Sequence, residues 1–403
     1  MTGGVEQAAR GSRPGSALVT DSALRTALFT IRNLGEHGVR ITVAERETAR
    51  MENLGSLSRY VSRRIVVPDN VTMPDAYAEA LLEHVEGHDV LMPIGMHTIE
   101  PVARRLDAFR QRTRVALPPW PVIERADDTR ALLRLAVSLG IPTPRTFALS
   151  EYASVEALAS EMILPAIVKI GVEAGLPPGE RYQIVSTVSE LRAAVDRMRR
   201  YTEAPIIQEL IVGDGIGFEA LYDYDGRLVA SFCHRRLREY PTTGGPSTFC
   251  ESCHVEGAAT YGRQLLDHLG WVGLAMVEFK MDRARGIPVL MEINPRPWGS
   301  IALPIRAGVE FPWLLYQLAR DGRLDQQPDY RDGIRLRYLV NDLQAAAAEW
   351  RQTSSLAAKF SLLGSVCDPR VKEGVLSLRD PLPSWAYLRK AAMRAGRMHA
   401  RRS

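Results

Sequence analysis

Apolar runs and amphipathic segments alternate along the first hundred residues of the chain. Short apolar runs are typical of strands, and the segments between them repeat apolar residues with a helical period. The pattern predicts strands at 17–20, 39–44, 65–68 and 89–93, and helices at 22–37, 74–86 and 98–110. Strands separated by helices favour a parallel, doubly wound α/β sheet. No G-x-G-x-x-G motif follows the first strand, so a dinucleotide is not expected there.

A proline cluster at 118–121 is the predicted boundary of this first domain, because clustered prolines end regular structure. Beyond it, Asp127 is predicted to cap a helix that ends at Gly140. An α+β unit follows, with a loop rich in Gly and Pro at 171–180. Its predicted strands are 146–149, 165–170 and 182–186, and its predicted helices are 154–162 and 188–201.

A largely antiparallel unit comes next, with predicted strands at 206–212, 217–224, 228–234, 274–282 and 288–294. Helices are predicted again at 311–321 and 341–363. We therefore divide the chain into five segments. They are a disordered tail (1–16), an α/β domain (17–118), two α+β lobes (119–204 and 205–322) and a helical extension with a basic tail (323–403).

The last two strands are predicted to form a hairpin that brings two carboxylates face to face. Its connection is centred on Arg285, which is equidistant in sequence from Glu278 and Glu292. Directly opposed residues of an antiparallel pair have Cβ atoms about 4.5–5.5 Å apart, so like charges there destabilise the pair. A bound cation would remove that repulsion.

Period-two alternation extends this site to Asn294, which is predicted on the same face as Glu292. Val289, Met291 and Ile293 are predicted on the other, apolar face. Two carboxylates and an amide oxygen make an all-oxygen site of the kind that Mg²⁺ accepts when substrate phosphates complete its coordination. The alternative is a hairpin with two solvated carboxylates.

Composition is that of an ordinary globular protein with two or three domains. The chain has 403 residues, 46% hydrophobic and 24% charged, and its net charge of +4 does not by itself indicate nucleic-acid binding. No apolar run reaches the roughly 18–20 residues that span a bilayer. Four cysteines without a disulfide framework suit a reducing compartment. We expect a cytoplasmic enzyme with small-molecule partners and no nucleic-acid partner.

One short motif points elsewhere. Cys250, Cys253 and His254 match the C-x-x-C-H pattern of haem attachment. A lone short motif is weak evidence without its structural setting, so coincidence is the favoured interpretation and the segment is expected to be a loop. A zinc site with further ligands from Cys233 or His234 is the alternative.

Residues 17–322 resemble the ATP-grasp superfamily, the ligases related to the large subunit of carbamoyl-phosphate synthase and to biotin carboxylase. The most specific part is the run Met291-Glu-Ile-Asn-Pro-Arg296, preceded by Glu278 at the expected distance. The resemblance implies an ATP-grasp fold, with a doubly wound pre-grasp domain followed by two α+β lobes that clamp ATP. It also implies that Glu278, Glu292 and Asn294 bind the Mg²⁺ of ATP, with Mn²⁺ as the alternative ion, and that Arg296 lies next to the transferred phosphoryl group.

The same resemblance implies a set of nucleotide-binding residues. Lys169 ends a predicted apolar strand and would bind ATP phosphates, while a surface lysine is the alternative. Adenine would be bound by the segment between the lobes and the ribose by Asp214; an ordinary buried strand is the alternative for that segment. The residues of the segment are Gln208, Glu209, Leu210 and Ile211.

A basic stretch is similar to the family segment that binds the γ-phosphate and the acceptor carboxylate. Arg235 and Arg236 are neighbours on a predicted strand and point to opposite faces, so only one of them is expected to reach the site. The sequence also departs from the family pattern, because Thr129 follows Asp128 where relatives often have a lysine.

The resemblance implies an ATP-dependent carboxylate–amine ligase that forms an amide through an acyl phosphate and releases ADP and phosphate. Small carboxylates and amines, such as amino acids, are the expected substrates, and a homodimer is the expected assembly. A carboxylase, a kinase-like enzyme and a nucleotide-binding regulator without turnover are the alternatives. The basic segment 385–403 is interpreted as a solvated tail, with contact to anionic membrane surfaces as the alternative.

Overall fold

The computed structural model describes residues 15–46, 53–170, 180, 182–241, 245–324 and 328–400, without the side chains beyond 393. The chain forms two compact units, which are described separately. Unit 1 combines the described part of Met1–Ala116 with Pro312–Arg323 and with the segment that begins at Val375, and unit 2 combines Leu117–Phe311 with Leu324–Gly374. Most of the predicted tail, the loop 171–179 and the basic side chains after 393 lie outside the described residues.

Unit 1 is built on a four-stranded sheet with the order β3-β2-β1-β4. All of its strand pairs are parallel, which confirms the predicted doubly wound α/β arrangement. Its strands are β1 (Ser16–Thr20), β2 (Arg40–Arg46), β3 (Val61–Val67) and β4 (Val90–Met92). Its helices are α1 (Arg25–Glu36), α2 (Pro74–His84), α3 (Met96–Arg104), α4 (Leu106–Arg110), most of α11 (Phe311–Asp321) and α14 (Pro381–Ala400).

A buried carboxylate attaches the C-terminal segment to unit 1. Asp380 accepts hydrogen bonds from Arg32 Nε at 2.9 Å, from Ser58 Oγ at 2.8 Å and from the Arg59 amide at 2.9 Å. Asp380 is only 1% exposed. Three donors satisfy the buried charge, which makes this contact specific to the segment that precedes α14.

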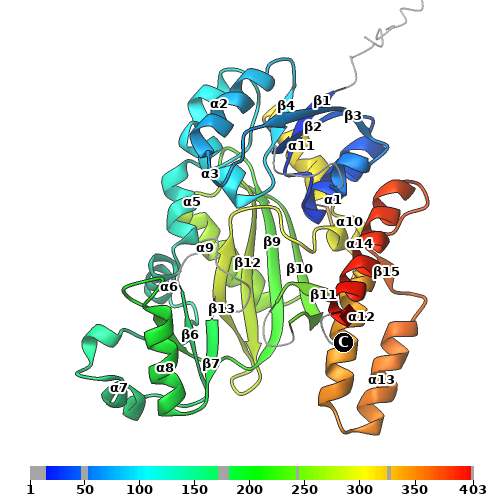
Figure 1. Ribbon diagram of the computed structural model, residues 1–403. Helices are drawn as coiled ribbons and strands as arrows, with labels where there is room; N and C mark the ends of the chain where they lie inside the picture. The colour runs from blue at the N-terminus through cyan, green and yellow to red at the C-terminus, as the bar shows by residue number, and fades with distance from the viewer. Residues whose placement is uncertain are drawn as a thin grey trace, which may run out of the picture. The chain divides into compact units, whose positions relative to one another are not determined.

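Unit 2 contains two sheets. The smaller sheet has the order β5-β8-β6-β7 and is antiparallel throughout. Apolar side chains of α7 (Val155–Glu161) and α8 (Val188–Met198) pack on it, including Leu158 and Leu191, and Figure 1 shows α8 beside β6 and β7. The strands are β5 (Thr146–Phe147), β6 (Ala166–Lys169), β7 (Tyr182–Val185) and β8 (Ile206–Glu209).

The larger sheet has seven strands in the order β13-β12-β9-β10-β11-β14-β15. Helix α9 (Glu256–Leu269) packs on one face, where Tyr222 donates a hydrogen bond to Asp267 of this helix at 2.7 Å (Figure 1). The strands are β9 (Gly213–Tyr222), β10 (Leu228–Glu239), β11 (Ser247–Ser252), β12 (Gly273–Asp282), β13 (Ile287–Asn294), β14 (Arg335–Arg337) and β15 (Lys372–Glu373).

Two predicted segments differ from the structure. The segment around Cys250 was expected to be a loop, but it forms strand β11, because its backbone pairs with β10 and β14 and Cys250 is fully buried. The predicted helix 341–363 is two helices, α12 (Leu339–Gln352) and α13 (Leu356–Cys367). The break falls at Ser355, whose side chain caps α13 by accepting from the Ala358 amide.

The predicted N-cap of the helix that was expected to end at Gly140 is also displaced by one residue. Asp127 is the last residue of α5 (Trp120–Asp127), and Asp128 caps α6 (Thr129–Ser138). Asp128 Oδ1 accepts from the amides of Arg130 at 2.8 Å and Ala131 at 3.1 Å. The prediction was wrong because adjacent aspartates offer two candidate caps, and only the backbone conformation selects one of them.

We expect Asp128→Ala to lower the free energy of unfolding by about 1 kcal/mol, because two amides at the start of α6 lose their acceptor. Asp127→Ala is the comparison and should cost less, since Asp127 is the last residue of α5 and the N-cap of α6 is Asp128. Urea unfolding of the two variants measures the difference. Equal losses in both variants would contradict the assignment of the cap.

Among the helices that the structure describes, none is both long enough and apolar enough to cross a membrane.

Candidate functional site

Strands β12 and β13 place the two predicted carboxylates opposite each other. Glu278 pairs directly with Glu292 in the antiparallel register, as the spacing around Arg285 predicts. Asn294 lies on the same face, because its Nδ2 donates to Glu292 Oε1 at 3.0 Å. The predicted arrangement of these three oxygen-bearing side chains is therefore confirmed, while their role in metal binding stays a prediction.

The alternation behind this prediction fails in one place. The register shifts by one residue between Glu278 and Phe279, which leaves Met291 as the extra residue of a bulge. As a result Val289 pairs with Lys280, on the same face as Glu278. The prediction that Val289 faces the apolar side is wrong for this reason, whereas Ile293 pairs with Val277 on the apolar side as predicted.

The surroundings of Glu292 explain why the pKa of its carboxyl is raised. Desolvation by the surrounding protein and the negative charge of Glu278 raise the pKa of the Glu292 carboxyl, and the hydrogen bond from Asn294 acts in the opposite direction. Glu292 keeps access to solvent, so an ion can approach it. The ionised form of Glu292 would therefore be stabilised by additional positive charge, such as that of a bound cation.

One of the two adjacent arginines reaches the carboxylates. Arg236 Nη2 lies 2.5 Å from Glu278 Oε2, and the side chains of both residues are 16% exposed. Arg235 pairs with Ile216 and Glu251, on the opposite face of the sheet. The prediction that only one arginine points to the site is confirmed, and Arg236 is that residue.

Lys169 approaches the carboxylates from the smaller sheet. It is the last residue of β6 and is partly buried. Burial lowers the pKa of its ammonium, while the negative charges of Glu292 and Glu278 act in the opposite direction. These three side chains therefore lie within electrostatic reach of one another, and a polyphosphate between them would interact with the ammonium.

Arg296 follows the hairpin directly and has no carboxylate within ion-pair distance among the described residues. Its Nη1 donates only a long bond of 3.4 Å, to the Pro297 carbonyl. Two contacts hold the loop beyond Arg296. The Gly299 carbonyl accepts a hydrogen bond from the Tyr338 hydroxyl at 2.7 Å, and Trp298 packs edge-on against Phe311. The loop is thus anchored beyond Arg296, which leaves the guanidinium available to an anion.

Several polar groups of the segment between the two sheets already form hydrogen bonds within the protein. Gln208 is buried and donates to Thr146 Oγ1 at 2.8 Å, and the Glu209 amide donates to the Arg145 carbonyl at 3.0 Å. Glu209 Oε1 also lies 2.7 Å from Arg285 Nη2. A bound adenine would therefore have to form its hydrogen bonds with the backbone of the residues that follow, Leu210 and Ile211.

The next residues complete the description of that segment. The Ile211 carbonyl accepts from Lys280 Nζ at 3.4 Å, and Asp214 Oδ1 pairs with Arg283 Nη2 at 3.2 Å. Leu210 lies between β8 and β9 and is partly exposed. The proposed adenine contacts of Leu210 and Ile211, and the proposed ribose contact of Asp214, stay predictions.

A buried acid–base pair beside the site was not predicted. Glu219 and His234 are 0% and 1% exposed, and Glu219 Oε1 lies 2.5 Å from His234 Nδ1. Burial raises the pKa of the Glu219 carboxyl. His234 shares a row with Glu278, since both pair with Gly217. The available sequence signal was an acid inside the apolar run of β9, but only the register shows its partner.

We expect Gly217→Ala to lower the free energy of unfolding by about 1–3 kcal/mol, because a Cβ there would meet His234 Cε1 at 2.4 Å and Glu219 Oε1 at 2.6 Å. Gly364→Ala is the control, since a Cβ at this position of α13 meets nothing within 4 Å. It should stabilise the helix slightly. Urea unfolding measures both, and a neutral Gly217→Ala would contradict the packing described for this pair.

The other residues of the basic stretch and of the cysteine motif make contacts within the protein. Arg238 forms a buried bidentate pair with Asp342, both bonds being 2.8 Å, so it attaches α12 to β10. Cys250 pairs with Arg236 in the ladder, and His254 Nδ1 lies 2.8 Å from Asp332. Within the described residues, no group of three or more His, Cys, Asp and Glu side chains is arranged to hold a metal ion.

The chemistry of the donor set on β12 and β13 fits Mg²⁺ that arrives with a nucleotide. Two opposed carboxylates and a neighbouring amide offer hard oxygen ligands, and Mg²⁺ is commonly held by one or two carboxylates together with substrate phosphates. Glu278, Glu292 and Asn294 would hold the ion. Lys169 and Arg236 add positive charge next to these carboxylates.

Comparisons with known proteins agree with this fold. The sequence pattern of a family described as ATP-grasp in the biosynthetic pathway with Ter operon matches residues 202–341, which include β9 to β13. A search of curated protein sequences finds no match.

Solved structures resemble the chain over most of its length. An N5-carboxyaminoimidazole synthetase from Staphylococcus aureus, complexed with ADP, has a TM-score of 0.63 at 13% identity and covers 84% of this chain and 86% of its own. An L-amino acid ligase from Bacillus licheniformis has a TM-score of 0.57 at 15% identity, with coverages of 79% and 75%.

A Rhizobium etli pyruvate carboxylase has a TM-score of 0.60 at 15% identity and covers 80% of this chain. This chain spans only 30% of the length of that carboxylase. The element order, the two sheets of unit 2 and these similarities define the class: the chain has the ATP-grasp fold, with a parallel α/β sheet ahead of one antiparallel and one largely antiparallel sheet.

Proposed function

We propose that this protein is an ATP-dependent carboxylate–amine ligase that forms an amide bond and releases ADP and phosphate. The observation that carries the proposal is the convergence of the opposed pair Glu278 and Glu292 with Arg236 of β10 in the same sheet and Lys169 of the other sheet. Two acids surrounded by cations match the charge pattern of a metal-bound polyphosphate. The ADP complex of the similar synthetase supports a nucleotide in this fold.

The chemistry has two steps. A carboxylate oxygen of the substrate attacks the γ-phosphorus of ATP, the bond to the β–γ bridging oxygen breaks, and ADP leaves. The amine then attacks the acyl carbon of the acyl phosphate, phosphate leaves, and the nitrogen loses a proton. The first step requires the γ-phosphoryl group to be held in line with the attacking oxygen, and nearby positive charge lowers the repulsion between the phosphates and the substrate carboxylate.

The side chains of this chain have distinct roles in these steps. Lys169 would bind the phosphates, and Arg236 and Arg296 would stabilise the charge that develops on the transferred group, as preorganised donors do. Glu278, Glu292 and Asn294 would orient Mg²⁺, which when bound supplies positive charge next to the phosphoryl group. The backbone at Leu210 and Ile211, with Asp214, would position the nucleoside.

Phosphate release with pairs of substrates tests the proposal. Purified protein with Mg-ATP is offered amino acids and small carboxylates, singly and two at a time, and free phosphate is measured. We expect release that requires both a carboxylate and an amine. Formation of ADP and a phosphorylated product with a carboxylate alone, without an equal amount of free phosphate, would favour a kinase-like reaction, and stimulation by bicarbonate would favour a carboxylase, the activity named for one of the similar structures.

A further inference from the structure

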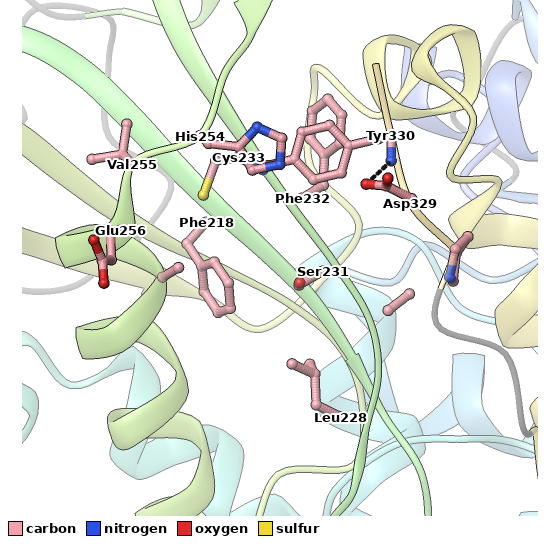
Figure 2. A pocket seen from close by; sticks show the side chains of 13 residues that line it. Phe218, Leu228, Ser231, Phe232, Cys233, His254, Val255, Glu256, Asp329 and Tyr330 are labelled. Atoms are coloured by element: carbon pink, nitrogen blue, oxygen red, sulfur yellow. Dashed lines mark hydrogen bonds between the residues drawn. The ribbon is translucent and has the colours of Figure 1, made fainter. Parts of the chain in front are cut away.

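A pocket of about 450 Å³ lies in unit 2, bordered by β9, β10, the start of α9 and the segment that ends at Tyr330 (Figure 2). Phe218, Ser231 and Cys233 of its lining lie on the face of the sheet opposite the carboxylates. Phe218 and Cys233 of the pocket pair with each other, and they alternate with Gly217 and His234 of the site row. Phe232 of the lining pairs with Glu219 on the other face, so the pocket also reaches around the free side of β10. Its volume falls in the range of small-molecule sites.

Part of β10 has an open edge in this pocket. Strand β11 pairs only with the second half of β10, from His234 onward, so the first half has β9 on one side and no strand on the other within the described residues. The hydroxyl of Tyr330 ends the ladder there. It accepts from the Cys233 amide at 3.2 Å and donates to the Cys253 carbonyl at 3.0 Å.

The direction of the backbone at Ser231 follows from this geometry. Cys233 directs its amide and its carbonyl away from β9, because the amide meets Tyr330 and the carbonyl accepts from the Cys253 amide. Backbone groups two residues apart point to the same edge of a strand. Ser231 therefore presents one donor and one acceptor toward the pocket, the pair of groups by which an added strand is recognised.

The walls of the pocket are mainly apolar and aromatic. Phe218 lies to the left of Ser231 in Figure 2, and the rings of His254 and Tyr330 stack with centroids 4.3 Å apart. Phe232 packs against Tyr330 at 4.5 Å. The His254 of the unexplained cysteine motif is thus a wall residue of this pocket.

The charge at the rim is negative. Glu256 and Asp329 are exposed and stand on opposite sides of the pocket in Figure 2. His254 is the one basic side chain in the lining that the structure describes, and it is paired with Asp332. Charge complementarity therefore favours a ligand with a positive group and an apolar body.

We propose that this pocket binds a short extended peptide with a free amino end and an apolar side chain. The peptide adds to the open edge of β10 through the backbone of Ser231, its side chain packs against Phe218, and its ammonium group lies among the acids of the rim. This inference does not depend on the proposed ligase activity. Because β9 and β10 also carry Gly217 and Arg236, the bound peptide contacts strands that build the nucleotide site.

Three probes distinguish the parts of this proposal by calorimetry. Leucyl-leucine amide carries the ammonium, the amides and the side chains. Its N-acetyl form lacks the charge, and 3-methylbutylamine lacks the amides. We expect saturable binding of leucyl-leucine amide, a loss of a few-fold on acetylation because the acids are exposed, and a loss of about tenfold or more for the simple amine.

Two variants test the location. Ser231→Pro removes the edge amide without removing a bond to β9, and proline is accepted at such edge positions. Ala259 is a half-buried residue of α9 that lines the pocket, and Ala259→Phe places a large side chain in it. We expect both to weaken binding by about tenfold or more, while Ser231→Ala, which keeps the amide, binds like the original protein.

Urea unfolding of each variant reports whether the fold is retained. If Ser231→Pro does not fold, Ala259→Phe alone decides the test of the location. No saturable binding of leucyl-leucine amide at millimolar concentration would overturn the proposal. Unchanged binding in Ala259→Phe would also overturn it, and so would equal binding of the dipeptide amide and 3-methylbutylamine.

Discussion

Glu292→Gln is expected to lower turnover by about two to three orders of magnitude, the range seen when one preorganised electrostatic contact is lost from a site. The amide keeps the shape of β13 but removes one of the two opposed negative charges that would face Mg²⁺. Folding should survive, because Glu292 repels Glu278 in the absence of a cation. Phosphate release measures the turnover, and urea unfolding measures the stability.

Glu251→Gln is the matched control for this substitution. Glu251 lies in the same sheet but pairs with Arg235 on the opposite face, so turnover should stay within a few-fold of the original value. Near-normal turnover in Glu292→Gln would remove the basis of the proposed metal site. A large loss in Glu251→Gln would show that the two faces have been assigned wrongly.

Arg296→Ala is expected to lower kcat by about a hundredfold or more and to change ATP affinity only a few-fold. A positive charge next to the transferred group contributes most in the transition state, so its loss affects chemistry more than binding. The guanidinium has no ion-pair partner among the described residues, so stability should change little. Calorimetry gives the ATP affinity and phosphate release gives kcat.

Arg235→Ala is the control for that prediction, since Arg235 points away from the carboxylates. Its turnover should remain close to the original value. A greater loss of turnover in Arg235→Ala than in Arg296→Ala would contradict the site, and so would a loss of ATP binding that accounts for the whole effect of Arg296→Ala.

Local periodicity was sufficient for the part of the site that lies on one hairpin. The opposition of Glu278 and Glu292 follows from their equal distance from Arg285, and a period of two implies that only one of Arg235 and Arg236 points toward them; the structure confirms both and identifies Arg236 as that residue. The same rule failed at Val289, because the bulge at Met291 inserts a residue that no composition signal marks.

Contacts between distant segments could not be derived in this way. The pair of Glu219 and His234 forms because β9 and β10 adopt one particular register, and no local pattern specifies that register. The proximity of Lys169 to the carboxylates was implied only by the family resemblance, since β6 belongs to a different sheet. Strand β11 was missed because its central Cys250 was interpreted as part of a short motif.

The identity of the product nucleotide tests the central claim most directly. With a carboxylate and an amine that support turnover, chromatography of the reaction should show ADP in amounts equal to the phosphate released, because the proposed site directs the carboxylate to the γ-phosphorus. AMP and pyrophosphate as the products would mean attack at the α-phosphorus, and that result would contradict the assignment of Lys169, Arg236 and Arg296 to the transferred phosphoryl group.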